Sequence, residues 1–289
     1  MDPANLVNLV IAGVLTGLVY GLMALGLSVI FGVVRVVNFA HGEMMTIAMY
    51  AAVLLFAGFK LDPFLAVLPV AAAFFVLGYA LQAGLINPFI TRPEHSQFML
   101  LVAVGIIMVN ALLIAFGPDA RSVQLDYLLD SIEVGPLLVD RGKLYAALVA
   151  CATSAALFAW FRFTLTGKAI RACADNWLGA KVVGLNVKRY YALTFGLGSA
   201  CVAVAGCMMV LLVDVTPVLG PGYTLLAFVI VIVGGLGSMA GALLGGVLIG
   251  VSEALAGLFI APSAKSMFSF ALLILVLLFR PQGLLGRKQ

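Results

Sequence analysis

The chain has 289 residues, of which 64% are apolar and only 10% are charged, and its net charge is +4 at pH 7. A typical soluble domain is about 25% charged, and a soluble fold of this composition would expose an aggregating apolar surface. The composition therefore excludes a soluble globular protein and favours one that uses the bilayer as its solvent. The basic residues lie mainly in short loops, a pattern typical of membrane topology rather than of nucleic-acid binding.

Apolar segments follow one another along the chain, separated by turn residues such as Asp62-Pro63 and Gly117-Pro118. Their approximate ranges are 6–33, 43–58, 63–86, 98–116, 143–163, 190–213, 224–257 and 266–280. The segment 224–257 is too long for one crossing, and its glycine-rich interruption divides it into two helices. We therefore predict one transmembrane domain over residues 1–289, an all-α, polytopic bundle of about eight or nine membrane segments with interrupted, re-entrant helices.

The charge of the loops predicts their sides of the membrane. Residues 162–189 carry six basic residues against one acid, so the positive-inside rule places them in the cytosol with the basic C-terminal tail. Residues 117–142 carry five acids against two basic residues, so we expect a periplasmic loop there. Alternation then places the N-terminus outside, unless a re-entrant piece at residues 35–43 inverts that end.

The first candidate site is the polar sequence Asn38-Phe39-Ala40-His41-Gly42-Glu43, which lies between two apolar runs. Ionisable groups at membrane depth cost several kcal/mol unless they face protein or water. The motif therefore either forms a pore-lining or gating turn, with Asn38, His41, Gly42 and Glu43 in the pathway, or is an ordinary solvated loop between two spans.

The second candidate site is the glycine break at residues 234–241. Broken helices expose backbone polar groups, which must line a cavity or be buried in protein. The break is either a re-entrant gate or a site of close helix packing. Residues 29–55 and 229–255 share the pattern of an apolar half, a break and an apolar half, which in transporters indicates the translocation path. The sequence leaves open whether they form a true repeat; Gly13, Gly17 and Gly21 are better explained by packing.

The third candidate site is the expected cytosolic loop at residues 164–189. Apolar residues recur there at helical spacing with charged residues opposite, which predicts one short amphipathic helix that ends near Gly184. The apolar stripe comprises Ile170, Cys173, Ala174, Trp177, Leu178 and Val182. Asn186 is expected to cap the next span. The helix either lies on the lipid surface or docks into a partner's groove.

Several chemistries have no support in the sequence. The pattern G-x-x-x-x-G-K-[ST] is absent because Arg162 stands where the first glycine before Gly167-Lys168 is needed, so the chain is not expected to hydrolyse nucleotides by that mechanism. The four cysteines form no C-x-x-C pair, and no carboxylate pair or metal cluster suggests an enzyme. We expect no catalytic residue, no metal site and no cofactor bound by this chain.

Together these features resemble the LivH-type permeases of branched-chain amino acid ABC importers. The family pattern N-F-A-H-G-E after a glycine-rich span matches Asn38–Glu43. Two loop patterns, G-K-x-x-R-A-x-A-[ED]-[ND] and A-x-x-x-G-[IL]-N, match Gly167–Asn176 and Ala180–Asn186. The pattern G-G-[LI]-G-S-x-x-G-A-x-x-G-G matches Gly234–Gly246, and the family's ending matches Phe270–Gly286. No family motif is recognised in residues 117–142.

The resemblance implies a multi-pass subunit of a bacterial inner (plasma) membrane importer for leucine, isoleucine, valine or related amino acids. It implies four kinds of partner besides lipid: a second related permease, two cytosolic ABC ATPases that hold ATP and magnesium, and a periplasmic substrate-binding protein. The implied pathway or gate residues are Asn38, His41, Gly42, Glu43, Gly234, Gly235, Gly237, Ser238 and Gly241. The implied ATPase-coupling residues are Gly167, Lys168, Ile170, Arg171, Ala172, Ala174, Asp175, Asn176, Trp177, Leu178 and Gly184.

Two other functions remain as alternatives. Relatives with similar motifs carry urea or short amides, so an ABC permease for those substrates is one. A stand-alone secondary transporter or channel is the other, but it would need an ion-coupling site in the membrane. The candidates for such a site, Glu43, Asp214 and Glu253, are not paired in the sequence.

Overall fold

The structure is a computed structural model that describes residues 3–90, 92–125, 130–134, 137–259 and 265–286. Within these ranges, eight helical segments are long and apolar enough to cross a membrane, and a ninth apolar helix, α11, is shorter. The predicted all-α, polytopic bundle is therefore confirmed. The α-helices are α1 (Pro3–Val34), α2 (His41–Phe59), α3 (Pro63–Ala80), α4 (Glu94–Phe116), α5 (Arg141–Phe163), α6 (Leu165–Asp175), α7 (Trp177–Val182), α8 (Val187–Met209), α9 (Gly220–Gly234), α10 (Met239–Phe259) and α11 (Lys265–Phe279).

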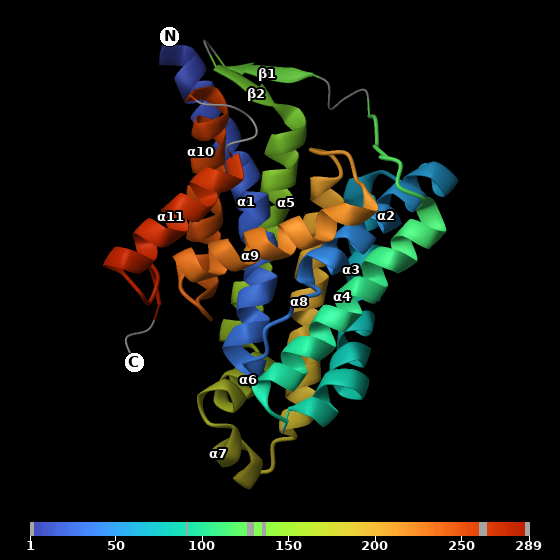
Figure 1. Cartoon of the computed structure of the whole chain (residues 1–289), viewed down its shortest axis with the longest axis vertical. Helices are drawn as coiled ribbons and strands as arrows, with labels where there is room; N and C mark the ends of the chain where they lie inside the picture. The colour runs from blue at the N-terminus through green and yellow to red at the C-terminus, as the bar shows by residue number, and fades with distance from the viewer. Residues whose placement is uncertain (1–2, 91, 126–129, 135–136, 260–264, 287–289) are drawn as a thin grey trace.

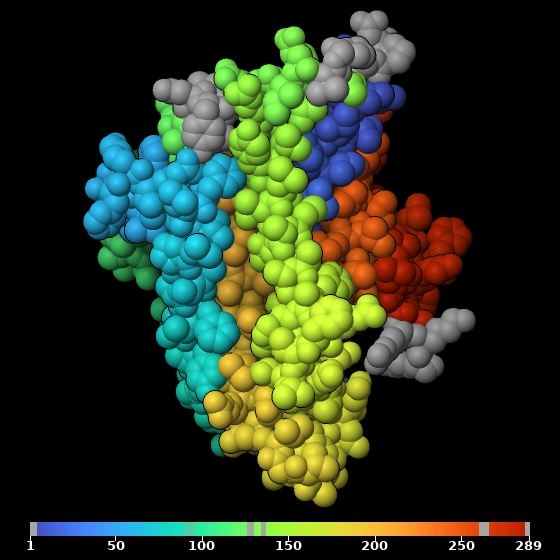
Figure 2. Space-filling model, turned by 180° about the vertical axis from the view of Figure 1, so that it is seen from behind, coloured from blue at the N-terminus to red at the C-terminus, as the bar shows by residue number. Residues whose placement is uncertain are grey.

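The centre of the bundle is α1, which packs against α8, α9 and α10 (Figure 1). Its glycines meet those of the antiparallel α10: a Cβ on Gly13 would lie 2.9 Å from the Gly250 carbonyl oxygen, and one on Gly17 would lie 2.7 Å from that of Gly246. The predicted packing role of these glycines is confirmed. Figure 2 shows the opposite face, where α5 covers the bundle along its length.

The long helices place the two predicted loops at opposite ends. The N-terminal part of α1 lies beside the loop that precedes α5, where the Leu138 amide donates to Asn8 Oδ1 at 3.1 Å. The helices α6 and α7 lie at the other end of the long axis (Figure 1). The N-terminal part of α1 is thus on the same side as the described part of the 117–142 loop, as the alternation of spans predicts.

The loop itself contains a small hairpin that the sequence did not predict. Strands β1 (Ser131–Val134) and β2 (Leu137–Asp140) pair antiparallel, with Ser131 opposite Asp140. An isolated bridge also joins Arg121 to Val215, the segment after α8. The fold is all-α in its membrane part, and the strands fasten the loop to other segments at its own end of the molecule.

The interruption before α2 lies within the bundle rather than outside it. After α1 ends at Val34, the irregular residues 35–40 turn back, and α2 begins at His41 beside Met23. Met23 precedes the end of α1 by 11 residues, which corresponds to roughly 16 Å along a helix. Residues 35–40 therefore re-enter the bundle, and the first of the two predicted interrupted segments is observed. The re-entry does not invert the N-terminal end, because the start of α1 stays beside the loop that precedes α5.

The two interrupted segments also pack across one another. Helix α1 contacts α10, and α2 contacts α9, so the first half of each segment lies on the second half of the other. Between α9 and α10, Gly237 approaches Gly32 near the end of α1. This crossed packing of the four helices brings the two breaks close to each other in the bundle.

Candidate functional site

The Asn38–Glu43 turn is buried in the bundle. Asn38 and His41 have no exposed side-chain surface, and Glu43 is 5% exposed. Gly42 is also buried. The interpretation of this motif as an ordinary solvated loop is therefore wrong, because its polar groups are enclosed by protein.

Each polar side chain of the turn has a defined partner. His41 Nε2 donates to the Met23 carbonyl oxygen at 2.9 Å, which ties the start of α2 to the middle of α1. Asn38 Oδ1 accepts from the Ala40 amide at 3.1 Å and so fixes the turn before α2. Buried polar groups without such bonds would cost free energy, so these contacts account for much of the turn's polar composition.

A three-member relay joins α2 to α9. The Gly42 amide donates to Thr224 Oγ1 at 2.8 Å, and Thr224 Oγ1 donates to Glu43 Oε2 at 2.7 Å. A side chain at Gly42 would collide with the backbone of Gly220 and Thr224, so only glycine permits this approach. Thr224 was not among the predicted site residues. It lies 181 positions from Glu43, and only its hydroxyl in an apolar stretch distinguished it.

A cavity of about 430 Å³ opens beside Glu43, between α2, α4 and α9. Glu43, Asn110 and Thr224 are its polar lining residues, and the rest of the wall is apolar apart from Gly105. We call it the central cavity. Its wall is open to the outside of the chain, since Ile106 and Leu225 are 58% and 53% exposed, whereas its carboxylate, Glu43, is buried.

A larger cavity of about 1050 Å³ adjoins it and is lined by Arg35, His95, Gln97, Gly237 and Ser238, among others. We call it the basic cavity. Phe39 lines both cavities. Its ring lies 4.6 Å from that of Phe98, edge to face, and 4.9 Å from that of Phe228. This cluster of three aromatic rings stands at the boundary between the two cavities.

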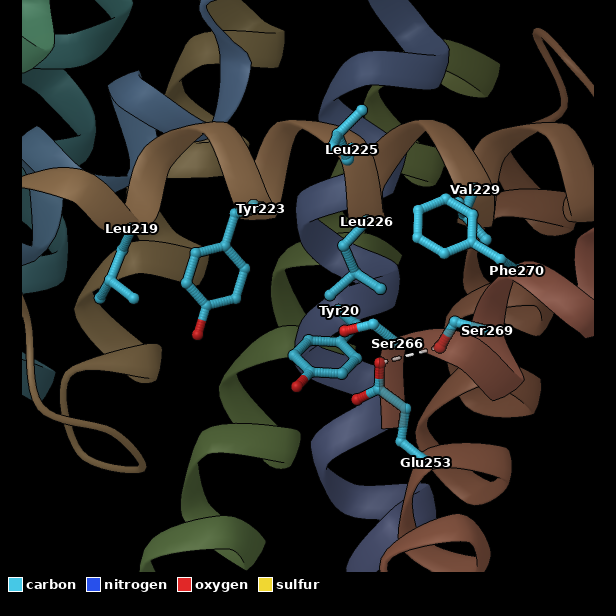
Figure 3. A pocket seen from close by; sticks show the side chains of 11 residues that line it. Tyr20, Leu219, Tyr223, Leu225, Leu226, Val229, Glu253, Ser266, Ser269 and Phe270 are labelled. Carbon is cyan, nitrogen blue, oxygen red and sulfur yellow. Dashed lines mark hydrogen bonds between the residues drawn. The ribbon is translucent and has the colours of Figure 1, made fainter. Parts of the chain in front are cut away.

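A third cavity, of about 470 Å³, lies on the other side of Leu225, which also lines the central cavity. Figure 3 shows Tyr20, Tyr223, Glu253 and Ser269 around it, from four different helices. Ser269 Oγ donates to Glu253 Oε1 at 2.9 Å. The third cavity therefore adjoins the central cavity at Leu225 of α9, and the central cavity adjoins the basic cavity at Phe39.

The glycine break combines both interpretations drawn from the sequence. Gly234, Gly235 and Gly241 are buried and packed against backbone. The C-terminal segment closes the break, since the Leu284 and Leu285 amides donate to the carbonyls of Val233 and Gly234, each at 2.9 Å.

The other two predicted residues of the break, Gly237 and Ser238, are accessible. Gly237 has a φ of 77° and lines the basic cavity together with Ser238, whose hydroxyl accepts from the Gly241 amide at 3.1 Å. One half of the break is thus a packing contact, and the other half is open to a cavity. The role of these residues in a pathway or gate stays a prediction.

The expected single amphipathic helix of the cytosolic loop is wrong. The segment forms two helices, α6 and α7, separated at Asn176. Thr164 caps α6 by accepting from the Gly167 amide at 3.0 Å, and Asn176 caps α7 by accepting from the Gly179 amide at 2.8 Å. An asparagine side chain that bonds ahead to the backbone favours a new helix start over continuation.

The division separates the predicted apolar stripe into two surfaces. Ile170 and Cys173 are 0% and 1% exposed, so they pack inside this chain and are not part of its outer face. Burial also raises the pKa of the Cys173 thiol. Gly167 is buried against the end of α5, and Ala174 is partly buried. The remaining predicted coupling residues on α6 are exposed: Lys168, Arg171, Ala172 and Asp175.

The outer surface of α7 carries exposed apolar side chains. Trp177 and Leu178 are each 57% exposed, and Val182 and Val183 are 81% and 75% exposed. We call these four residues the α7 patch. Gly184 follows with a φ of 87°, and the Gly184 and Leu185 amides donate to the carbonyls of Lys181 and Ala180, which is a Schellman end. Asn186 caps α8 through the Arg189 amide, as predicted.

Comparison with known proteins decides the family. Residues 9–277 match the family described as "Branched-chain amino acid transport system / permease component". This chain belongs to that family. The relatives named high-affinity branched-chain amino acid transport system permease protein LivH, from Salmonella typhimurium and Escherichia coli, are each 30% identical to it over 96% of this chain and 94% of the relative. BraD of Pseudomonas aeruginosa is 31% identical with the same coverage.

A solved structure, PsaBC from Streptococcus pneumoniae in complex with Fab, aligns with 95% of this chain and 91% of its own at 16% identity and a TM-score of 0.46. The resemblance to LivH-type permeases is confirmed by the family match. The chain is a multi-pass membrane permease of a transport system. Among the described residues, no group of three or more His, Cys, Asp or Glu side chains could hold a metal ion.

Proposed function

We propose that this chain is the permease subunit of an ATP-driven importer that carries leucine, isoleucine, valine or related amino acids across the inner membrane of a bacterium. Family membership and the relatives' names support the substrate class. The single observation that carries the pathway is the row of three adjoining cavities, joined through Leu225 and Phe39. Polar groups at membrane depth mark such paths.

The proposed partners follow from the half-open form of this row. Exposed lining residues, among them Ile106, Leu225 and Leu236, leave the cavity walls incomplete, and a second, related permease would complete them. A periplasmic binding protein would deliver the substrate, and two cytosolic ABC ATPases would hold ATP and magnesium. The α7 patch is the proposed ATPase contact. Its position at the far end of the long axis (Figure 1) favours a partner outside the membrane over the lipid surface.

The test is ATP hydrolysis and uptake by the complex in proteoliposomes, prepared with the second permease and the ATPase subunits. Binding protein loaded with leucine, isoleucine or valine should stimulate hydrolysis, and leucine should accumulate inside. Stimulation only by a urea-loaded or amide-loaded protein would replace the substrate assignment. Uptake without ATPase subunits would favour a secondary transporter or channel instead.

Trp177→Ala tests the contact itself. Truncating a central aromatic anchor of an interface costs about 2 kcal/mol or more, so co-purification of the ATPase should fall, and substrate-stimulated hydrolysis should fall with it. Lys168→Ala, on the exposed side of α6, is the matched control and should retain both. Full assembly and uptake with Trp177→Ala would contradict the docking assignment. A greater loss with Lys168→Ala or Arg171→Ala would favour binding to anionic lipid.

A further inference from the structure

The central cavity combines one buried carboxylate with an apolar wall. Glu43 is 5% exposed and lines the cavity. The wall beside it is formed by Val102, Ile106 and Val109 of α4 and by Leu225 of α9. None of the residues that line this cavity is Lys, Arg or His. A single negative group therefore faces an otherwise neutral and mostly apolar space.

The carboxylate is held in one orientation from α9. Thr224 Oγ1 accepts from the Gly42 amide and donates to Glu43 Oε2, so its one proton is directed at the carboxylate. The other oxygen, Oε1, lies toward α4, 3.5 Å from where a Cβ on Gly105 would stand. The absence of a side chain at Gly105 leaves space beside this oxygen. Pre-orientation of a charged group by fixed hydrogen bonds is characteristic of a binding site.

The volume and the lining residues of the central cavity together indicate the chemical class of its ligand. A cavity of about 430 Å³ is within the range of roughly 300–1,000 Å³ of small-molecule sites. A carboxylate suits an ammonium group through a charge-assisted hydrogen bond, and the aliphatic wall suits a branched side chain. An anion without an ammonium group would find no positively charged side chain among the lining residues.

We propose that Glu43, oriented by Thr224, binds the ammonium group of the amino acid as it passes through the central cavity. This inference rests on the proposed function and assigns a substrate-contacting role to one residue of that pathway. Glu43 is the binding group, and Thr224 is a positioning residue. The aromatic cluster at Phe39 separates this site from the basic cavity, so the substrate would pause there before it moves on.

A structural role for Glu43 is the competing explanation, because a carboxylate in the first turn also stabilises the start of α2. Glu43→Gln separates the two roles. Glutamine has the same shape and can still accept from Thr224, but it lacks the charge that attracts ammonium. The matched control is Glu133→Gln, which neutralises an exposed carboxylate in the β1 strand.

The experiment measures leucine uptake, stimulated ATP hydrolysis and thermal stability of the complete complex in proteoliposomes. With Glu43→Gln, uptake should fall about tenfold or more, as expected for loss of a charge-assisted bond, while stimulated hydrolysis and stability stay near wild type. The ratio of ATP hydrolysed to leucine transported should rise accordingly. Thr224→Val, which lacks the hydroxyl, should also lower uptake, whereas Thr224→Ser, which keeps it, should leave uptake near wild type.

Three outcomes are distinguishable. Wild-type uptake by Glu43→Gln would overturn the ammonium site while leaving the proposed importer intact. A loss of stability or assembly in Glu43→Gln that matches its loss of uptake would show a structural role for Glu43 instead. A wild-type complex that neither hydrolyses ATP in response to loaded binding protein nor takes up leucine would refute the proposed function itself.

Discussion

The close packing of α1 on α10 predicts a large effect from adding a single methyl group. Gly17 of α1 faces α10, and a Cβ added there would lie 2.7 Å from both the Gly246 carbonyl oxygen and the Val247 Cα. Carbon atoms in contact normally stand about 3.5–4.0 Å apart, so Gly17→Ala requires the two helices to separate by about 1 Å. Both neighbouring atoms belong to the backbone, so no side-chain rotation can relieve the collision.

The expected cost is that of overpacking, about 1–3 kcal/mol. Helix propensity acts in the opposite direction, because alanine is about 0.8–1.0 kcal/mol better than glycine in a helix interior. Gly58→Ala is therefore the matched control, since a Cβ at Gly58 meets nothing within 4 Å. The purified protein in detergent should lose several degrees of apparent Tm with Gly17→Ala and none with Gly58→Ala.

The measurement is the temperature at which the monodisperse protein disappears in size-exclusion chromatography after heating. An apparent Tm for Gly17→Ala equal to that of Gly58→Ala would refute the reasoning, because it would mean that α1 and α10 part without cost. A drop for both variants would also refute it, since it would show sensitivity to any glycine replacement rather than to the close approach of these helices.

Two further predictions concern topology and the glycine break. Ser122→Cys, at an exposed position of the 117–142 loop, should react with an impermeant thiol reagent added outside intact cells, in a Cys151→Ser background that removes the exposed native thiol. Labelling only after permeabilisation would reverse the topology. Gly235→Leu should lower both uptake and apparent Tm, because Gly235 has a φ of 108° and an added Cβ would meet the backbone of Leu285 and Gly286. The control Gly84→Leu, at a position where an added Cβ meets open space, should lower neither.

The sequence predicted the spans well because their signal is local. Apolar stretches long enough to cross a bilayer, with turn residues between them, have few other interpretations. Asp62 shows this: it was expected at a break, and it caps α3 by accepting from the Phe64 amide at 2.9 Å. The division of residues 224–257 into two helices was confirmed for the same reason, since adjacent glycines disfavour a continuous helix.

Features that depend on tertiary contacts were not accessible in this way. The periodicity of residues 170–182 was correctly recognised as helical, but it did not show that Ile170 would face inward and Trp177 outward. The capping bond of Asn176 decides that division. Thr224 was missed for a related reason, because its importance comes from a contact with Glu43 across the bundle. The short β1–β2 hairpin lay in a loop without a recognised motif.

The burial of α6 bears directly on how a contact at α7 would influence the cavities. Helix α6 packs against α1, α5 and α8 through its buried side, so it is joined firmly to the bundle while the α7 patch remains exposed. Helix α1 in turn holds the start of α2 through the bond between Met23 and His41. A displacement of α6 relative to the bundle would therefore act on α1, to which the Asn38–Glu43 turn is attached. A ligand shifts such an equilibrium only by its difference in affinity for the two states. The proposed ATPase partner would therefore have to bind the α7 patch more tightly in one arrangement of α6 and α1 than in the other.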